Sequence, residues 1–198
     1  SKLKEDFSLR PSQVLTEDFS IPGSAARALH LASERLGTLD VVVNLVGNRR
    51  VKGLSNLRSQ DLNQDIQVNY VSCLDLAQEA SRRSCIAEGG LLLFISSVAV
   101  SRPEGGLISY IASKGGLESL VRALSVELAT AGIRVNLLSL GLVESSMSRD
   151  LKTIIGSSRY QQILDTYPEG VGSPDDVAQV INFLVSEKAR WFSGVNIT

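Results

Sequence analysis

The chain has few of the residues on which several classes of protein depend. Its 198 residues include one histidine, two cysteines and only 5% aromatic side chains. The single histidine, His30, argues against a zinc site and against a catalytic triad with a histidine base. Cys73 and Cys85 match no metal-ligand or redox spacing, so we interpret them as reduced thiols of a cytoplasmic protein.

Strong net charge and long apolar runs are also missing. The formal net charge is -1, which argues against nucleic acid and against an anionic membrane as charge-driven partners. No apolar run approaches the ~20 residues that span a bilayer, and residues 1–6 lack the apolar core of a secretion signal. The hydrophobic content of 43% suffices for the core of a single domain, which we assign to residues 1–198.

The order of the apolar segments indicates the fold class. Short aliphatic and β-branched runs alternate with long helical stretches, which predicts an α/β fold with a parallel sheet. Ser173 is expected to begin a helix, because a proline and two acidic residues follow it. The predicted strands cover residues 13–15, 39–46, 91–95 and 133–138 and resume at 195, and the predicted helices cover residues 22–36, 59–87, 107–131 and about 173–186.

Polar residues follow the predicted strands at their carboxyl ends, where parallel α/β sheets bind ligands. Tyr110 and Lys114 lie four residues apart on the helix after Ser97, so the two share one helix face. A nearby ammonium lowers the pKa of a phenol from its ordinary value of about 10. Such a pair could pass a proton to a carbonyl oxygen that Ser97 also hydrogen-bonds. Taken alone, the spacing is more typical of a surface tyrosine beside a surface lysine.

Five segments, in order, resemble the short-chain dehydrogenase/reductase family, in the branch that contains the 3-oxoacyl-carrier-protein reductases. They are Asn-Leu-Val-Gly at 44–47, Gln-Val-Asn-Tyr at 67–70, Ile-Ser-Ser at 95–97, Tyr-x-x-x-Lys at 110–114 and Ile-Arg-Val-Asn at 133–136. The resemblance implies a Rossmann-type doubly wound parallel sheet. It also implies an NAD(P)-dependent oxidoreductase that acts on a carbonyl or secondary alcohol, with NAD and NADP undecided.

The resemblance implies a role for each matching residue and no metal ligand. Tyr110 would be the general acid or base, and Lys114 would lower the Tyr110 pKa and bind the nicotinamide ribose. Ser97 would position the substrate oxygen, and the carbonyl of Asn69 would hold a water of the proton relay. The implied cofactor-binding residues are Asp18, Asn44, Val46, Gly47, Tyr110, Lys114, Gly141, Val143 and Ser145.

The resemblance further implies a lid over the substrate, at residues 144–170, and a homo-dimer or homo-tetramer. The lid's apolar side chains either line a pocket or pack as an ordinary amphipathic helix. Subunits of the family usually pair through the helices predicted at 59–87 and 107–131, and the leucines of the second helix either form that interface or face the sheet. Ala131 argues weakly against a carrier-bound acyl substrate, because the carrier-protein reductases commonly have a basic residue there. The residues concerned are Met147, Leu151, Ile154, Ile155, Tyr160 and Tyr167 in the lid and Leu117, Leu120 and Leu124 in the helix.

The chain departs from the family pattern at both ends. The family's first two strands and the Gly-rich turn that cradles the pyrophosphate have no counterpart, nor does the tail after the last strand. We therefore expect the strand at 39–46 to be a sheet edge and the chain to be part of a longer protein. Direct pairing of residues 13–15 with 39–46 would contradict this. The alternative function is a non-catalytic scaffold or subunit that has lost cofactor binding.

Overall fold

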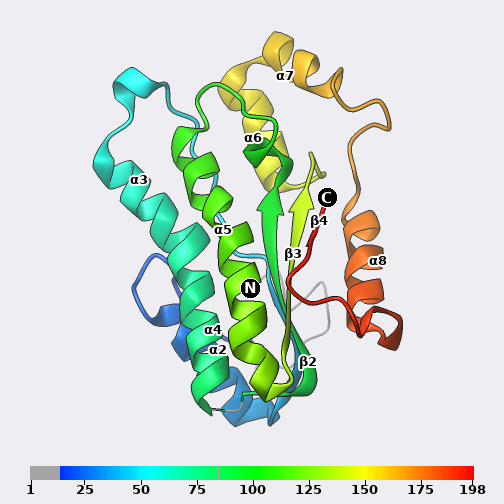
Figure 1. Cartoon of the computed structure of the whole chain (residues 1–198). Helices are drawn as coiled ribbons and strands as arrows, with labels where there is room; N and C mark the ends of the chain where they lie inside the picture. The colour runs from blue at the N-terminus through cyan, green and yellow to red at the C-terminus, as the bar shows by residue number, and fades with distance from the viewer. Residues whose placement is uncertain (1–13, 84) are drawn as a thin grey trace.

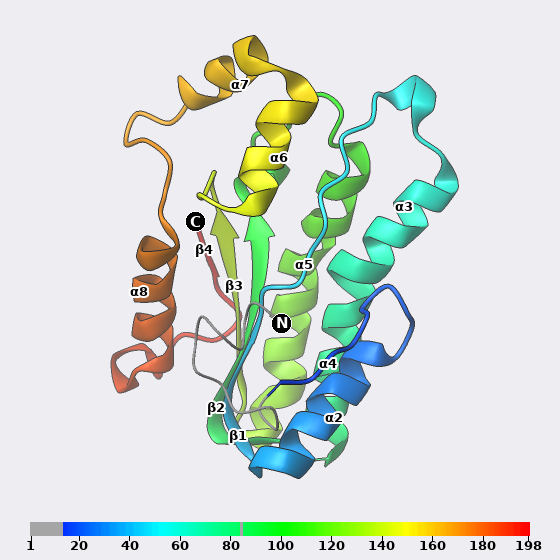
Figure 2. The ribbon, with the colours of Figure 1, turned by 180° about the vertical axis from the view of Figure 1, so that it is seen from behind.

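A computed structural model describes residues 14–83 and 85–198, which form one parallel sheet with helices on both faces (Figures 1 and 2). The strand order is β1-β2-β3-β4, and every neighbouring pair is parallel. This confirms the prediction of an α/β fold with a parallel sheet. The strands are β1 (Leu39–Asn44), β2 (Ile86–Ser97), β3 (Arg134–Leu140) and β4 (Asn196–Ile197).

Helices α2, α4 and α5 cover one face of the sheet, and α8 covers the other (Figure 1). Helices α6 and α7 lie beyond the carboxyl ends of the strands. The helices are α2 (Ser24–Leu36), α3 (Ser59–Ile66), α4 (Ser72–Arg83), α5 (Ile108–Glu127), α6 (Ser146–Ile155), α7 (Ser157–Leu164) and α8 (Pro174–Val185), with a π-helical segment η3 (Gln67–Val71) and short 3-10 segments η2 (Leu54–Asn56), η4 (Val98–Val100), η5 (Leu128–Ala131) and η6 (Glu187–Ala189).

The central strand β2 carries the core because successive side chains point to opposite faces of the sheet. Leu92 and Phe94 pack among α2, α4 and α5, whereas Leu91 and Leu93 pack beneath α8. All four are fully buried. A strand buried on both faces requires a continuous apolar run, which is the pattern that the sequence has here.

Helix α8 begins where its sequence predicts. The Ser173 hydroxyl accepts a hydrogen bond from the Asp176 amide at 3.2 Å, and the Asp176 carboxylate accepts one from the Ser173 amide at 2.8 Å. This reciprocal pair satisfies two amides that the first turn leaves without a helical partner. Pro174 occupies the first helical position, where a missing N–H costs nothing.

The prediction of one long helix at 59–87 is wrong at its carboxyl end. The observed helical segment is also interrupted by η3. Helix α4 ends at Arg83 and β2 already begins at Ile86, so Gly90 lies inside the strand. The register between β1 and β2 shifts just after Leu39 pairs with Ile86. A Cβ on Gly90 would lie 2.5 Å from Cγ2 of Ile86 and 2.9 Å from the Asp40 carbonyl, so the irregular strand needs a glycine there.

The strand predicted at 13–15 is also wrong where it can be checked. Gln13 lies outside the described residues, and Val14 and Leu15 are not in a strand. So short a segment forms a strand only beside a hydrogen-bonding neighbour, and β1 pairs with β2 alone among the described residues. Strand β1 is therefore a sheet edge, as expected.

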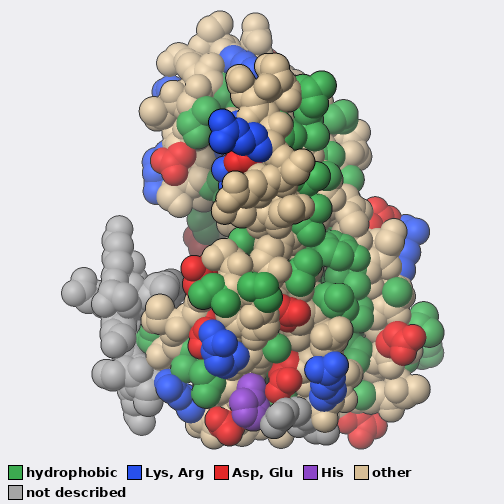
Figure 3. All heavy atoms as spheres, turned by 90° about the vertical axis from the view of Figure 1, so that its left-hand side faces the viewer, with side chains coloured by type: hydrophobic (Ala, Val, Ile, Leu, Met, Phe, Trp, Pro, Cys, Tyr) green, Lys and Arg blue, Asp and Glu red, His purple; other side chains and the backbone are tan. Residues whose placement is uncertain are grey.

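The leucines of α5 face the sheet. Leu117 is fully buried, and Leu120 and Leu124 pack against the same core cluster. Of the two alternatives, these leucines therefore face the sheet and do not form an exposed subunit interface. No helix in residues 14–83 and 85–198 combines the length and the apolar content that a bilayer span requires. The face in Figure 3 intersperses basic and acidic side chains, which agrees with the small net charge.

Candidate active site

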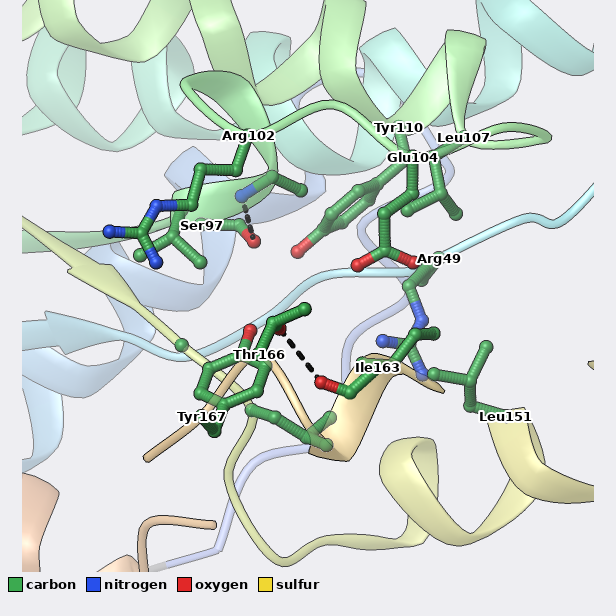
Figure 4. A pocket seen from close by; sticks show the side chains of 14 residues that line it. Arg49, Ser97, Arg102, Glu104, Leu107, Tyr110, Leu151, Ile163, Thr166 and Tyr167 are labelled. Atoms are coloured by element: carbon green, nitrogen blue, oxygen red, sulfur yellow. Dashed lines mark hydrogen bonds between the residues drawn. The ribbon is translucent and has the colours of Figure 1, made fainter. Parts of the chain in front are cut away.

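Two hydroxyl groups converge on a small cavity of about 70 Å³ at the carboxyl end of β2. Ser97 is the last residue of β2, and Tyr110 lies in the first turn of α5. Figure 4 shows the two hydroxyls pointing toward one another into the cavity. The Ser97 oxygen accepts a hydrogen bond from the Ala99 amide at 3.2 Å, which leaves its own O–H free to donate.

The Tyr110 phenol is kept protonated by its surroundings. The residue is only 9% exposed, and burial raises the pKa of the phenol above its ordinary value. A hydrogen bond with Ser97 and the positive charge of Arg49 oppose that rise in pKa. The resulting group is a proton donor near neutrality, held beside two groups that stabilise the phenolate once the proton leaves.

Lys114 lies one turn further along α5 and is buried. Its ammonium donates a hydrogen bond to the Ile95 carbonyl at 2.7 Å, and burial lowers the pKa of the amine. The positive charge that acts on the Tyr110 pKa is that of Arg49, whereas the charge of Lys114 acts on the Cys73 thiol. The Lys114 ammonium is directed to the Ile95 carbonyl at the end of β2, and the expectation that it lowers the Tyr110 pKa stays a prediction.

Asn69 lies in the π-helical segment η3, a local geometry that is common at functional sites. Its fully buried amide accepts from the Asn48 amide at 2.9 Å and donates to the Asn48 carbonyl at 3.0 Å. It also donates to the Ser113 hydroxyl at 2.9 Å. The Asn69 side chain thereby ties the loop after β1 to α5, close to Lys114. The backbone carbonyl of Asn69 accepts a long hydrogen bond of 3.5 Å from the Cys73 thiol.

The turn after β1 brings the backbone close to Lys114. The Asn44 carboxamide accepts from the Val46 amide at 3.1 Å and donates to the Cys73 sulfur at 3.2 Å, which fixes the turn. A Cβ on Gly47 would lie 3.1 Å from Oδ1 of Asn69 and 3.3 Å from Nζ of Lys114. A side chain at Gly47 would therefore crowd both groups.

The segment after β3 forms the other wall of an open cleft of about 330 Å³. Val143 forms a parallel bridge with Gly172 that uses the Leu142 carbonyl and the Glu144 amide. The N–H and C=O of Val143 itself therefore point away from Gly172. Ser145 caps α6, because its oxygen accepts from the Ser148 amide at 3.1 Å.

The structure brings together most of the expected residues, but not all of them. Asn44 and Val46 line a second, apolar groove along β1 instead of the cleft. Asp18 is exposed, and its carboxylate accepts from the Ser20 amide at 2.9 Å, at the start of α2. The residues that line the cleft and were expected there are Gly47, Ser97, Tyr110, Lys114, Gly141, Val143 and Ser145.

Arg49 was missed in the sequence, whereas Tyr167 was named there as one of the lid residues that could line a pocket. Arg49 lines both the cavity and the cleft, and it donates a hydrogen bond to the Met147 carbonyl at 2.6 Å. Tyr167 lines the cavity, and a Cβ on Gly141 would lie 3.0 Å from its ring, which explains a glycine at that position. Within 144–170, Leu151 also faces the cavity, whereas Tyr160 and Ile155 line neither space.

Comparison with known proteins decides the family. A family model described as "Enoyl-(Acyl carrier protein) reductase" matches residues 2–198. The chain belongs to the short-chain dehydrogenase/reductase family. This short-chain dehydrogenase/reductase is 30% identical over 158 residues to the 3-oxoacyl-[acyl-carrier-protein] reductase FabG of Buchnera aphidicola, covering 79% of this chain and 63% of that protein. The chain therefore spans less than two thirds of that relative.

Solved structures confirm the Rossmann-type fold expected for this short-chain dehydrogenase/reductase. It superposes on a glucose/ribitol dehydrogenase-type short-chain dehydrogenase/reductase from Brucella melitensis with a TM-score of 0.85 at 28% identity, covering 99% of this chain and 78% of that one. It superposes on a short-chain dehydrogenase from Burkholderia cenocepacia, solved in complex with NADP, with a TM-score of 0.83 at 26% identity, covering 93% and 73%.

Proposed function

We propose that the protein transfers a hydride between a nicotinamide cofactor and a carbonyl or secondary-alcohol substrate. The observation that carries the proposal is the pair of hydroxyls, Ser97 and Tyr110, that face one cavity beside the cleft. A carbonyl oxygen that accepts from both would sit where a proton donor and a second hydrogen-bond donor meet. The Buchnera relative, named as a reductase, supports the same reaction class.

The cleft fits a nicotinamide group. Val143 directs its N–H and C=O away from Gly172, so both are available to a carboxamide. Gly47 and Gly141 keep the floor and wall of the cleft free of side chains, and Lys114 offers an ammonium to ribose hydroxyls. When bound, the reduced cofactor supplies the hydride. We propose NADP rather than NAD, because the Burkholderia relative holds NADP.

Tyr110 supplies the proton in the direction of reduction. Burial raises the pKa of its phenol, so the phenol remains protonated near neutral pH and can donate to the carbonyl oxygen as negative charge develops there. The Ser97 O–H donates to the same oxygen and positions it. In oxidation, the phenolate takes the proton of the alcohol. Such proton transfer typically contributes about 10²- to 10⁴-fold to the rate.

Asn69 and Lys114 act behind Tyr110. We propose that the Asn69 carbonyl holds a water that returns a proton to Tyr110 through Lys114. The π-helical segment supports this role, because such irregular helical geometry is common at functional sites, and the Asn69 backbone carbonyl accepts a long 3.5 Å bond from the Cys73 thiol. The Asn69 amide holds Asn48 and Ser113 in place around the relay.

Residues 144–170 are proposed as the lid of the substrate cavity. Leu151 and Tyr167 from this segment line the cavity, and Met147 accepts the hydrogen bond of Arg49. We also propose a homo-oligomer, as is common in the family, and a cytoplasmic location. The two cysteines are free and buried, as suits a reducing compartment.

The test uses the full-length protein that contains this chain. NADPH and NADH consumption is followed at 340 nm with a panel of ketones, aldehydes and oxo acids, and product is identified by mass spectrometry. We expect stoichiometric conversion of at least one carbonyl compound to its alcohol. Cofactor binding without turnover of any compound, or no binding of either cofactor at millimolar concentration, would favour the non-catalytic scaffold.

A further inference from the structure

Three basic residues follow the turn at Gly47, and they differ in how their charges are balanced. Arg50 lies 3.1 Å from the Asp61 carboxylate and 3.4 Å from the Asp65 carboxylate. Lys52 lies 2.7 Å from the Asp61 carboxylate. Among residues 14–83 and 85–198, no carboxylate forms an ion pair with Arg49.

Arg49 instead directs its charge into the catalytic cavity. It is half-buried and lines the cavity with Ser97 and Tyr110, and Figure 4 shows its guanidinium among Leu151 and Ile163. Its one hydrogen bond to a described residue goes to the Met147 carbonyl at 2.6 Å, so most of its five N–H groups remain available.

The balance of charge in this cavity is positive. Arg102 also lines it, but this side chain is exposed and its guanidinium points away from the Tyr110 hydroxyl in Figure 4. Glu104 lines the same cavity, yet its carboxylate forms no ion pair with Arg49 or Arg102 within the described residues. The guanidinium of Arg49 therefore has N–H groups that can donate charge-assisted hydrogen bonds to a negatively charged ligand in the cavity.

We infer that Arg49 binds a carboxylate of the substrate, so that the substrate is an oxo acid whose carbonyl lies between Ser97 and Tyr110. A guanidinium pairs with a carboxylate through two parallel hydrogen bonds, and this geometry would fix the carbonyl relative to Tyr110. The apolar walls formed by Leu107, Leu151 and Ile163 suit the carbon chain between the two groups. The inference rests on the proposed function and names the substrate class for the same cavity.

The test compares oxo acids with their methyl esters, which carry the same ketone without the charge. Pyruvate, acetoacetate and levulinate place the carboxylate at increasing distance from the ketone, and the full-length protein is assayed with each acid and ester. We expect kcat/KM for at least one acid to exceed that of its ester by about tenfold or more. Equal values for every acid and ester would overturn the inference.

Variants then assign the preference to Arg49. Arg49→Gln should lower the acid-to-ester ratio of kcat/KM by about 10- to 100-fold, as expected for a lost charge-assisted hydrogen bond. Arg49→Lys should restore part of the ratio. Arg122→Gln removes an equal charge from an exposed i,i+4 pair on α5 and should leave the ratio unchanged. A ratio unchanged in Arg49→Gln with a raised KM for NADPH would overturn the inference, because Arg49 would then bind a cofactor phosphate.

A binding measurement separates this inference from the proposed function. The thermal unfolding midpoint is recorded with acetoacetate or methyl acetoacetate, in the wild type and in Arg49→Gln. We expect the acid to raise the wild-type midpoint more than the ester does, and this difference to vanish in the variant. If no carbonyl compound is turned over, the proposed function is rejected. If the acid still raises the midpoint more than the ester does in Arg49→Gln, the role of Arg49 is rejected.

Discussion

The carboxyl end of β2 and the open edge of β1 are built differently. At the end of β2, half-buried Ser97 and buried Lys114 and Asn69 are held by hydrogen bonds to the backbone or to other side chains. Along β1, a groove of about 440 Å³ is lined almost wholly by apolar side chains. Leu36 there is 60% exposed. The proposed proton-transfer site is thus positioned by contacts within the chain, whereas the β1 edge offers apolar surface and few polar groups.

This difference predicts that substitutions at the end of β2 have large effects and that substitutions of exposed side chains in the β1 groove have small ones. The largest effect is expected for Tyr110→Phe, which removes the proton donor and little else. The variant should lower kcat/KM about 10²- to 10⁴-fold. NADPH affinity, measured by fluorescence titration, should change little.

Tyr160→Phe is the matched control, because the same hydroxyl is removed from a tyrosine that lines neither the cavity nor the cleft. Its kcat/KM should equal that of the wild type. If Tyr110→Phe were as active as this control, the assignment of Tyr110 would be wrong.

The next largest effect is expected for Asn69→Ala, measured as the free energy of unfolding in urea. The substitution removes the hydrogen bonds that the Asn69 carboxamide makes with the Asn48 amide, the Asn48 carbonyl and the Ser113 hydroxyl. Losing these buried partners should cost about 2–4 kcal/mol. Asn63→Ala on the exposed face of α3 should change the free energy by less than about 0.5 kcal/mol. Equal effects would mean that Asn69 does not tie η3 to α5.

Ser97→Ala should have an intermediate effect on rate and a distinct effect on pH dependence. The hydrogen bond with Ser97 lowers the pKa of Tyr110, so its loss raises that pKa further. Reduction needs the protonated phenol, so the pH at which the rate of reduction declines should move upward. The loss of the second hydrogen-bond donor should also lower kcat/KM about 10- to 100-fold. Oxidation, which needs the phenolate, should require a more alkaline pH.

Ser96→Ala distinguishes Ser97 from its neighbour. The Ser96 hydroxyl donates to the Lys114 carbonyl at 3.3 Å and does not act on the Tyr110 pKa. The pH profile of this variant should match that of the wild type. A shift in the pH profile as large as that of Ser97→Ala would mean that Ser97 has been assigned the hydroxyl role in error.

The smallest effect is expected along the β1 groove. Leu36→Gln replaces an exposed side chain at the end of α2 by a residue of similar helix propensity, and should change the free energy of unfolding by less than about 0.5 kcal/mol. Leu29→Ala, in the same helix but 3% exposed, should cost about 2–5 kcal/mol. A cost for Leu36→Gln as large as that for Leu29→Ala would show that the groove is packed and would remove the contrast between the two regions.

The fold was predictable where a local signal agreed with the tertiary structure. Ser173, Pro174 and Asp176 predict the cap of α8, and a run of apolar residues predicts the core strand β2. The start of β2 was missed because a pair of glycines reads as a helix stop. Only the register against β1, with the Asp40 carbonyl 2.9 Å from where a Cβ of Gly90 would lie, shows that these glycines belong to the strand.

The same holds for the site. The spacing of Ser97, Tyr110 and Lys114 locates the proton-transfer groups, because the strand end and one helix face place them together. Arg49 could not be found in this way, since a charged residue in a loop usually faces water. A count gives the only sequence signal: three basic residues follow Gly47, and α3 brings two carboxylates to them, Asp61 and Asp65.

The transfer of deuterium to product from NADPH that is deuterated at both C4 positions tests the central claim most directly. The full-length protein is incubated with the labelled cofactor and its best carbonyl substrate, and the product is analysed by mass spectrometry and NMR. The account predicts one deuterium on the carbinol carbon in the wild type, and product formation about 10²- to 10⁴-fold slower in Tyr110→Phe with the label on the same carbon. Unlabelled product in the wild type, or no product, would contradict hydride transfer at this site.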